Sequence, residues 1–432
     1  MKSKTKLLLS LAPLALAPSL HAVDYIWDGG GANAAWGQAG NWVGDLNPAS
    51  LNNTSDVIYA DTAAARLTET NFLGANRTIR SLAYDSDVTA THTLQFSSAG
   101  GTFPGRDIVF DADSGNSTVT VDSNALIIWQ DSGVVDAGGS GAAILNNDLD
   151  IVHNGTGIFR TLNAIIDGTS AAKVTKSGTG SLELKGTNTF SGGLEIQNGQ
   201  VFISTSNSGV AGLGTGDITL NSSIPTASSP SVDGATLFVQ DPGAANPTIT
   251  NDLVLTGNGG TILIGGNTTT FSGATSGTGD LRKNGGGNVI FSGAYSFGGD
   301  LTVDGGGAVT LGQSGTFTFD IDGSGVNNTI TQGIGTTSGL SLDGTFVFDL
   351  TSAGTGLTDE WSIIGSTILA QAAFGTNFDV SGFTEGTSGV WTSGIYQFDE
   401  GTGNLTVVPE PSAYALLGGL LALSWVMVRR RK

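Results

Sequence analysis

Residues 174–201 read VTKSGTGSLELKGTNTFSGGLEIQNGQV, and residues 281–308 read LRKNGGGNVIFSGAYSFGGDLTVDGGGA. The two segments align without a gap, and the alignment places Lys176 on Lys283. Self-similarity over such a length is typical of repeat architectures. It indicates that one long structural unit has been duplicated within this chain.

Apolar and polar residues alternate within each copy, as the run from Ser181 to Lys185 illustrates. Period-two alternation, with Gly and Asn between the runs, predicts short β-strands joined by tight corners. We expect residues 146–315 to form stacked parallel rungs with the apolar set pointing inward, because a one-residue slip would bury Glu183 and Glu195 instead. The predicted inward residues are Leu182, Leu184, Leu194 and Ile196 in the first copy, and Val289, Phe291, Leu301 and Val303 in the second.

The segment 174–204 resembles the autotransporter-associated β-strand repeat, whose pattern has the form L-x-K-x-G-x-G-x-L-x-L-x-G-x-N-x-[FY]-x-G-G. The second copy, 281–311, is more degenerate, because Tyr295 stands where the first copy has Asn188. The resemblance implies an all-β protein with a right-handed parallel β-helix, a fold found in adhesins and structural surface proteins. An array of β-sandwiches would use the same turn chemistry and is the alternative architecture.

Composition and charge exclude several classes of function. Of 432 residues, 67 are Gly and only 12% are charged, which suits a stack of rungs because like charges repeated about 4.8 Å apart repel each other. Residues 23–408 hold 36 acidic residues and 10 Lys or Arg, a net charge of −26 (10 minus 36), which argues against nucleic acid as a partner. No Lys or Arg occurs from Asn284 to Val428. Cys is absent, which excludes thiol catalysis, thiolate metal sites and disulfides.

The N-terminal residues 1–22 have the pattern of a secretory signal peptide. Three lysines precede an apolar run from Leu7 to Leu20, and the small residue Ala22 follows it. We predict cleavage between Ala22 and Val23, so the mature body would lie outside the cytoplasm.

The C-terminal residues have a three-part pattern. An uncharged run from Ser412 to Val428 would extend roughly 25 Å as a helix, and we predict a transmembrane helix over 412–428. A basic cluster follows as the expected stop-transfer element, and it would keep the end of the chain cytoplasmic. Two prolines ahead of the helix predict an exposed, extended segment. The basic residues are Arg429, Arg430, Arg431 and Lys432, and the segment ahead of the helix is Val408, Pro409, Glu410 and Pro411.

The tail, residues 409–432, resembles the PEP-CTERM sorting signal. The resemblance implies that an exosortase, a membrane-embedded processing enzyme, recognises and processes this tail. It also implies a Gram-negative host, an inner-membrane-anchored precursor, and a final location at the cell surface or in the extracellular matrix.

The remaining body divides by strand pattern. We predict an N-terminal β-rich cap with the first rungs over 23–145, solenoid repeats over 146–339, and a C-terminal β cap over 340–408, where aromatic residues are denser. A solenoid end exposes unpaired backbone and apolar core, so each end needs a cover. Trp27, Trp36 and Trp42 would pack in the N-terminal cap, although clustered Trp residues could also stack on sugars.

No motif selects an enzyme. No Ser has the G-x-S-x-G context of a hydrolase elbow, and repeat positions such as Lys176 suit a scaffold better than a catalytic base. The stretches 111–116 and 320–323 resemble only the first half of a calcium loop. We predict no catalytic residue, no cofactor and no metal site. The expected function is that of an exported structural or adhesin-like protein, with an extracellular polysaccharide as a candidate partner; a carbohydrate-active enzyme or a glycan-binding module on a β-helix is the alternative.

Overall fold

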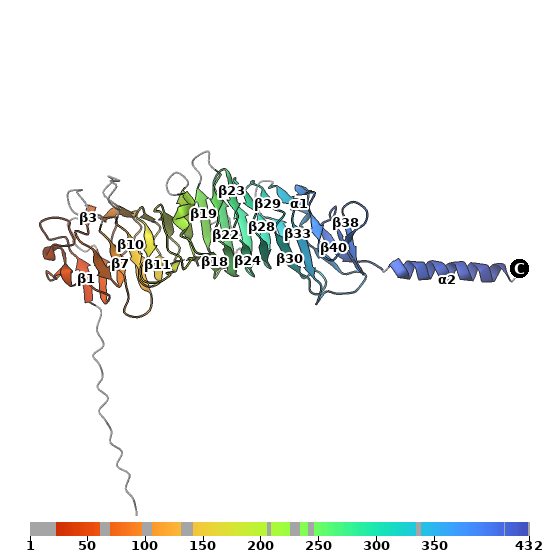
Figure 1. The fold of residues 1–432 in the computed structure, drawn as a ribbon, viewed down its shortest axis with the longest axis horizontal. Helices are drawn as coiled ribbons and strands as arrows, with labels where there is room; N and C mark the ends of the chain where they lie inside the picture. Colours follow the sequence, from red (N-terminus) through yellow and green to blue (C-terminus); the bar gives the residue numbers. More distant parts are fainter. Residues whose placement is uncertain are drawn as a thin grey trace, which may run out of the picture.

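The computed structural model describes residues 23–60, 70–96, 106–130, 141–204, 209–224, 234–240, 246–333, 338–409 and 411–430. Figure 1 shows an elongated stack of short strands, with one helix, α2 (Pro411–Arg429), extending from its C-terminal end. The signal-peptide prediction for 1–22, including Ala22, lies outside the described residues, as do Glu410, Arg431 and Lys432. Val23 is the first residue that the structure describes.

Parallel strands build three faces of the stack, and the chain visits the faces in the same order in successive rungs. We call the faces 1, 2 and 3. Face 1 is an 11-stranded sheet that a 3-stranded sheet continues, face 2 is an 11-stranded sheet, and face 3 consists of a 4-stranded and a 6-stranded sheet. All the strand pairs within these faces are parallel among the described residues. The predicted parallel β-solenoid is therefore confirmed as an all-β, mostly parallel stack.

The strands of each face are short, because the chain turns a corner after every few residues. Face 1 comprises β1 (Val23–Trp27), β2 (Ser55–Tyr59), β5 (Ser81–Tyr84), β8 (Ser117–Val121), β11 (Leu149–His153), β14 (Val174–Ser177), β16 (Leu194–Ile196), β18 (Ile218–Ser222), β21 (Leu253–Gly257), β24 (Thr275–Gly277), β27 (Tyr295–Phe297), β30 (Thr316–Asp320), β33 (Thr345–Asp349) and β36 (Asp379–Val380). Face 2 comprises β3 (Thr70–Phe72), β6 (His92–Gln95), β9 (Ile127–Gln130), β12 (Ile158–Thr161), β15 (Ser181–Leu184), β17 (Gln200–Ser204), β19 (Thr236–Gln240), β22 (Gly260–Ile264), β25 (Leu281–Asn284), β28 (Leu301–Val303) and β31 (Ile330–Gln332). Face 3 comprises β4 (Arg77–Ile79), β7 (Ile108–Phe110), β10 (Ala143–Leu145), β13 (Ile165–Asp167), β20 (Thr248–Ile249), β23 (Thr268–Phe271), β26 (Asn288–Phe291), β29 (Val309–Leu311), β32 (Leu340–Leu342) and β35 (Ala372–Phe374).

The core fills the inside of the stack with one apolar layer per rung. Inward and outward positions alternate along each strand, so in-register stacking places apolar side chains directly above one another. The residues predicted to point inward are all buried, at 2% exposure or less: Leu182, Leu184, Leu194, Ile196, Val289, Phe291, Leu301 and Val303.

The C-terminal end is covered by a different kind of sheet. Five antiparallel strands lie in the order β34-β40-β39-β38-β37 and bury Trp361 and Phe398. This cap sheet joins face 2 through a parallel bridge between Ile330 and Ile364. The parallel rungs themselves continue past residue 340, up to β36. The cap comprises β34 (Glu360–Ser362), β37 (Thr384–Glu385), β38 (Val390–Ser393), β39 (Tyr396–Asp399) and β40 (Asn404–Val407), with the short helix α1 (Ser366–Leu369) beside it.

The N-terminal end is covered by aromatic residues. Trp27, Trp36 and Trp42 are at most 1% exposed and meet edge to face, with ring centroids 5.2 Å apart for Trp27–Trp42 and 5.6 Å apart for Trp36–Trp42. The Trp36 indole N–H donates to the Tyr59 hydroxyl at 2.6 Å. These rings are packed in the end of the solenoid, so they offer no face on which a sugar could stack.

The C-terminal helix departs from its prediction in two ways. α2 begins at Pro411, not at Ser412, so Pro411 lies in the helix and not in an extended segment; proline fits the first helical turn, where its missing N–H costs no hydrogen bond. Among the residues that the structure describes, no helix is long and apolar enough to cross a membrane. The transmembrane prediction for 412–428 is therefore not confirmed.

Candidate functional site

The repeat lysines lie inside the solenoid. Lys176 is in register with the inward residues Ile151 and Ile196, and its whole residue is 0% exposed. Lys283 is equally buried and is in register with Ile262 and Val303. A side chain in this position has no access to solvent, so it serves the fold.

Each lysine ammonium holds the corner that follows its strand. Lys176 Nζ donates to the carbonyls of Ser177 at 2.7 Å, Gly178 at 2.8 Å and Asn198 at 3.2 Å, and Asn198 belongs to the next rung. Lys283 Nζ donates to the carbonyls of Gly285 at 2.6 Å and of Asp304, in the next rung, at 3.4 Å. The lysines therefore tie successive corners together by donating to the carbonyls of both.

Burial lowers the pKa of both lysine amines. Desolvation lowers the pKa of Lys176 to about 7 and that of Lys283 to about 8, because the charged form loses its hydration. Nearby, burial and the Lys176 charge lower the pKa of His153 to about 4. These groups belong to the scaffold, and we return to them as probes of stability.

The two acidic repeat positions have different surroundings. Glu195 lies outside on face 1, and despite partial burial its pKa is lowered to about 2 by hydrogen bonds from Lys173, Asn221 and Gln197. Glu183 also lies outside, on face 2, yet it is only 2% exposed. It is enclosed because Arg160 and Lys185 both pair with its carboxylate.

The sorting segment begins directly at the folded cap. The Val408 N–H donates to the Ile395 carbonyl at 2.7 Å, and this backbone hydrogen bond ties Val408 to the end of the cap sheet. Pro409 follows and is half-buried, and α2 starts two residues later. Trp425 and Arg429 near the end of α2 form a cation–π contact, 4.4 Å from guanidinium carbon to ring centroid.

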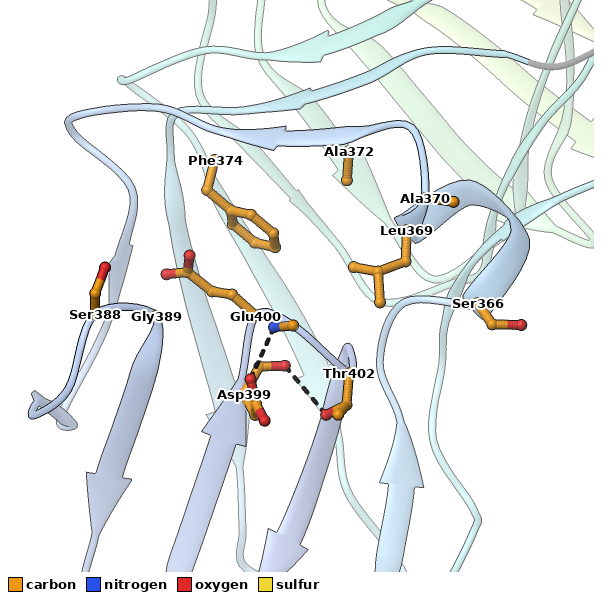
Figure 2. Close-up of a pocket in the computed structure, with 11 residues that line it drawn as sticks. Ser366, Leu369, Ala370, Ala372, Phe374, Ser388, Gly389, Asp399, Glu400 and Thr402 are labelled. Carbon is orange, nitrogen blue, oxygen red and sulfur yellow. Dashed lines mark hydrogen bonds between the residues drawn. The ribbon is translucent and has the colours of Figure 1, made fainter.

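A groove of about 730 Å³ lies between the cap sheet and the last rungs. Figure 2 shows the side chains of Leu369, Phe374 and Glu400 converging on it. One wall comes from α1 and β35 and is largely apolar, and the other comes from the turns that join β37 to β38 and β39 to β40. The lining residues are Ser366, Leu369, Ala370, Ala372, Phe374, Ser388, Gly389, Asp399, Glu400, Gly401 and Thr402.

The carboxylates of this groove are held in place. Glu400 Oε1 accepts from the Trp391 indole N–H at 2.8 Å, and Trp391 itself is packed against Phe378. Asp399 Oδ1 accepts from the Gly401 N–H at 2.8 Å. Each acid thus keeps a defined direction, and in the part of the chain that the structure describes its other oxygen accepts no hydrogen bond.

A second groove, of about 660 Å³, adjoins the first, because both are lined by Ser366 and Thr402. Most of its lining residues carry a polar side chain: Gly325, Asn327, Thr329, Thr331, Glu360, Ser362, Ser366, Thr402 and Asn404. Sequence reasoning missed both grooves, because their residues are scattered over about 80 positions and meet only where the cap sheet docks on the last rungs. Within the described part of the chain, no group of three or more acidic or His side chains is arranged to hold a metal ion.

Comparison with known families agrees with the repeat pattern. Residues 174–201 and 281–311 match the family model described as the passenger-associated-transport-repeat. No curated protein and no solved structure matches the chain. Passenger-associated repeats within a parallel β-stack make this chain similar to an autotransporter passenger, and such repeats imply an exported, cell-surface protein.

Proposed function

We propose that this protein is an exported structural or adhesin-like β-solenoid of the cell envelope or extracellular matrix, and that it acts without catalysis. The observation that carries the proposal is the parallel stack from β1 to β36, with two passenger-type repeats inside it. The repeat lysines hold corners inside the stack, which supports a role that depends on the length and rigidity of the stack.

The stack gives the molecule reach. Eleven strands in register on face 1 have ten spacings of about 4.8 Å, or nearly 50 Å along the axis, before the 3-stranded continuation and the cap are added. A rigid rod of this kind holds a binding surface away from the point of attachment. Surface scaffolds and adhesins have this structural role.

The proposal includes processing of the tail by an exosortase. Its support is the order of parts in the sequence: a proline-flanked acid, an apolar helical stretch and a basic end, placed directly after the last cap strand. The apolar stretch would contact the membrane, and the basic cluster would stay on the cytoplasmic side. An enzyme that cuts near Glu410 would release the body without disturbing β40, which ends at Val407.

The test is the mass and location of the full chain in a Gram-negative host that contains an exosortase. We expect the wild-type protein at the cell surface or in the matrix, ending near Glu410 and lacking Trp425 and Met427. Glu410→Ala should leave a membrane-bound precursor with its tail. The matched control, Glu385→Ala, removes an exposed acid of the cap and should be processed like the wild type.

Two results would contradict the proposal separately. A wild-type chain that extends to Lys432 in a host with an active exosortase rejects the processing step. A protein that stays in the cytoplasm of that host, as judged by fractionation and by protection from added protease, rejects the surface location itself.

A further inference from the structure

The two adjoining grooves at the C-terminal cap form one surface with acidic side chains in both parts, Asp399 and Glu400 in the first groove and Glu360 in the second. They share Ser366 and Thr402, and strand pairing sets three of their residues in a row: Ser362 opposite Asn404, and Asn404 opposite Asp399. Adjacent strands lie about 4.8 Å apart, so this row alone extends about 10 Å across the sheet. The surface is long enough for several units of a chain-like ligand.

The charge of this surface is negative and has no cation nearby in the sequence. Glu360, Asp399 and Glu400 line the grooves, and the chain has no Lys or Arg from Asn284 to Val428. One oxygen of each carboxylate is held: by Asn404 Nδ2 on Glu360, by the Gly401 N–H on Asp399 and by Trp391 on Glu400. Within the described residues the other oxygens accept no hydrogen bond, so they are free to meet a cationic group of a ligand.

The remaining lining decides between classes of cationic ligand. Asn327, Thr329, Thr331, Ser362 and Thr402 offer amides and hydroxyls, which both donate and accept, as sugar hydroxyls do. Phe374, Leu369 and Ala372 supply an apolar strip beside the acids, which suits the C–H face of a sugar ring. A basic peptide would also meet the acids, but it offers the mixed donors and acceptors of the second groove only one backbone N–H and one C=O per residue, whereas each sugar ring offers several hydroxyls.

We propose that this surface binds a polysaccharide of amino sugars that carry free amines, with ammonium groups on Glu360, Asp399 and Glu400, and hydroxyls on the Asn, Thr and Ser side chains. The inference rests on the proposed function, because it names the polysaccharide with which a matrix scaffold would associate. Anionic polysaccharides are repelled by a body of net charge −26, and neutral ones can donate hydroxyl hydrogen bonds to the three carboxylates but gain no charge–charge attraction from them.

Isothermal titration of the purified mature protein tests the proposal with defined probes. The probes are a glucosamine hexamer, the same hexamer fully N-acetylated, a glucose hexamer and hexalysine. We expect the glucosamine hexamer to bind at least about tenfold more tightly than either uncharged hexamer and more tightly than hexalysine, with affinity falling as salt is added.

The variant Asp399→Asn/Glu400→Gln should weaken binding of the glucosamine hexamer by about fivefold to tenfold, the factor expected for losing two solvent-accessible charge pairs. The control, Asp87→Asn/Asp113→Asn, makes the same change in net charge at exposed positions among the N-terminal rungs and should change the affinity less than about twofold. Unchanged melting temperatures of both variants exclude a loss of fold.

Equal binding of the acetylated and free-amine hexamers would overturn the proposal, as would equal weakening by both double variants or tighter binding of hexalysine. These outcomes are separate from a failure of the proposed function, which shows in the location and mass of the protein in its host and not in a titration.

Discussion

The two repeat copies carry the same motif on different faces of the solenoid. Lys176 lies in β14 on face 1, whereas Lys283, its equivalent, lies in β25 on face 2. The next strand of the first copy, β15, is on face 2, and its equivalent, β26, is on face 3. The second copy is thus shifted by one face around the axis, although both copies bury their lysine and the apolar residues predicted to point inward.

This shift shows what the repeat encodes. In both copies a buried lysine lies two positions after an apolar strand residue, and a glycine two positions later turns the corner with φ of +72° at Gly178 and +84° at Gly285. Nothing in the motif specifies which face it occupies. The motif is therefore a unit of strand, lysine-held corner and strand, which occupies two different edges of this stack.

The largest expected effect comes from the corner glycines. A Cβ on Gly178 would lie 2.4 Å from the His153 carbonyl oxygen, and one on Gly285 would lie 2.2 Å from that of Ile264. We expect Gly178→Ala and Gly285→Ala each to cost about 2–5 kcal/mol of unfolding free energy, from the left-handed backbone plus the clash. Thermal and denaturant unfolding measure it.

Gly382 provides the control for the corner glycines. It has a similar φ of +76°, but a Cβ added there would meet no atom within 4 Å, so Gly382→Ala should cost only the backbone penalty of about 1–2 kcal/mol. Equal losses in all three variants would show that the neighbouring rung does not constrain the corner.

The buried lysines give the next largest effect. Lys176→Met keeps the apolar stem but leaves three carbonyls without the ammonium, and Lys283→Met leaves two. At about 1–3 kcal/mol for an unsatisfied buried polar group, we expect both variants to be destabilised, Lys176→Met more strongly. Lys173→Met, on an exposed side chain paired with Glu195, should cost less than about 1 kcal/mol. A reversed order would reject the corner role.

Sequence reasoning succeeded for the repeats and failed for the grooves, for a physical reason. The period-two pattern is local, so it identified Leu182, Leu194 and their equivalents as core residues. The face that each strand occupies depends on corner lengths that vary: 20 residues separate Val174 from Leu194, whereas 35 separate Ile218 from Leu253.

The candidate site depends on contacts that no local pattern reports. Asn327 and Asn404 line one groove because an antiparallel sheet docks on the last rungs, and that docking is set by tertiary packing around Trp361. The tail shows the same limit, since the prolines suggested an extended segment up to 411, yet Pro411 opens a helix.

The pH dependence should separate the lysines from the rest of the scaffold. The pKa of Lys176 is lowered by burial to about 7 in the folded state, against about 10.4 for a free lysine, so the unfolded chain binds more protons between these values. Stability should therefore rise as the pH increases from about 7 towards 10. Lys176→Met should flatten this rise in melting temperature, and an unchanged slope would show that the amine does not titrate in that window.

The smallest expected effect concerns a position at which the two copies carry different residues. Asn188 is buried, accepts from the Ile165 N–H at 2.8 Å and donates to the Gly212 carbonyl at 2.6 Å. Its equivalent Tyr295 is equally buried, and its hydroxyl donates to the Gly312 carbonyl at 3.1 Å. The tyrosine thus also gives a hydrogen bond to a backbone carbonyl of another rung, so the second copy replaces the asparagine with a residue of the same role.

Tyr295→Phe should lower the free energy of unfolding by only about 0.5–1.5 kcal/mol, the value of one net hydrogen bond. Asn188→Ala should lower it more, because it leaves one backbone N–H and one backbone carbonyl without a partner. Denaturant unfolding of the two variants decides it: if Tyr295→Phe is the more harmful, the tyrosine contributes more than a substitute for the asparagine, and the two copies are not equivalent at this corner.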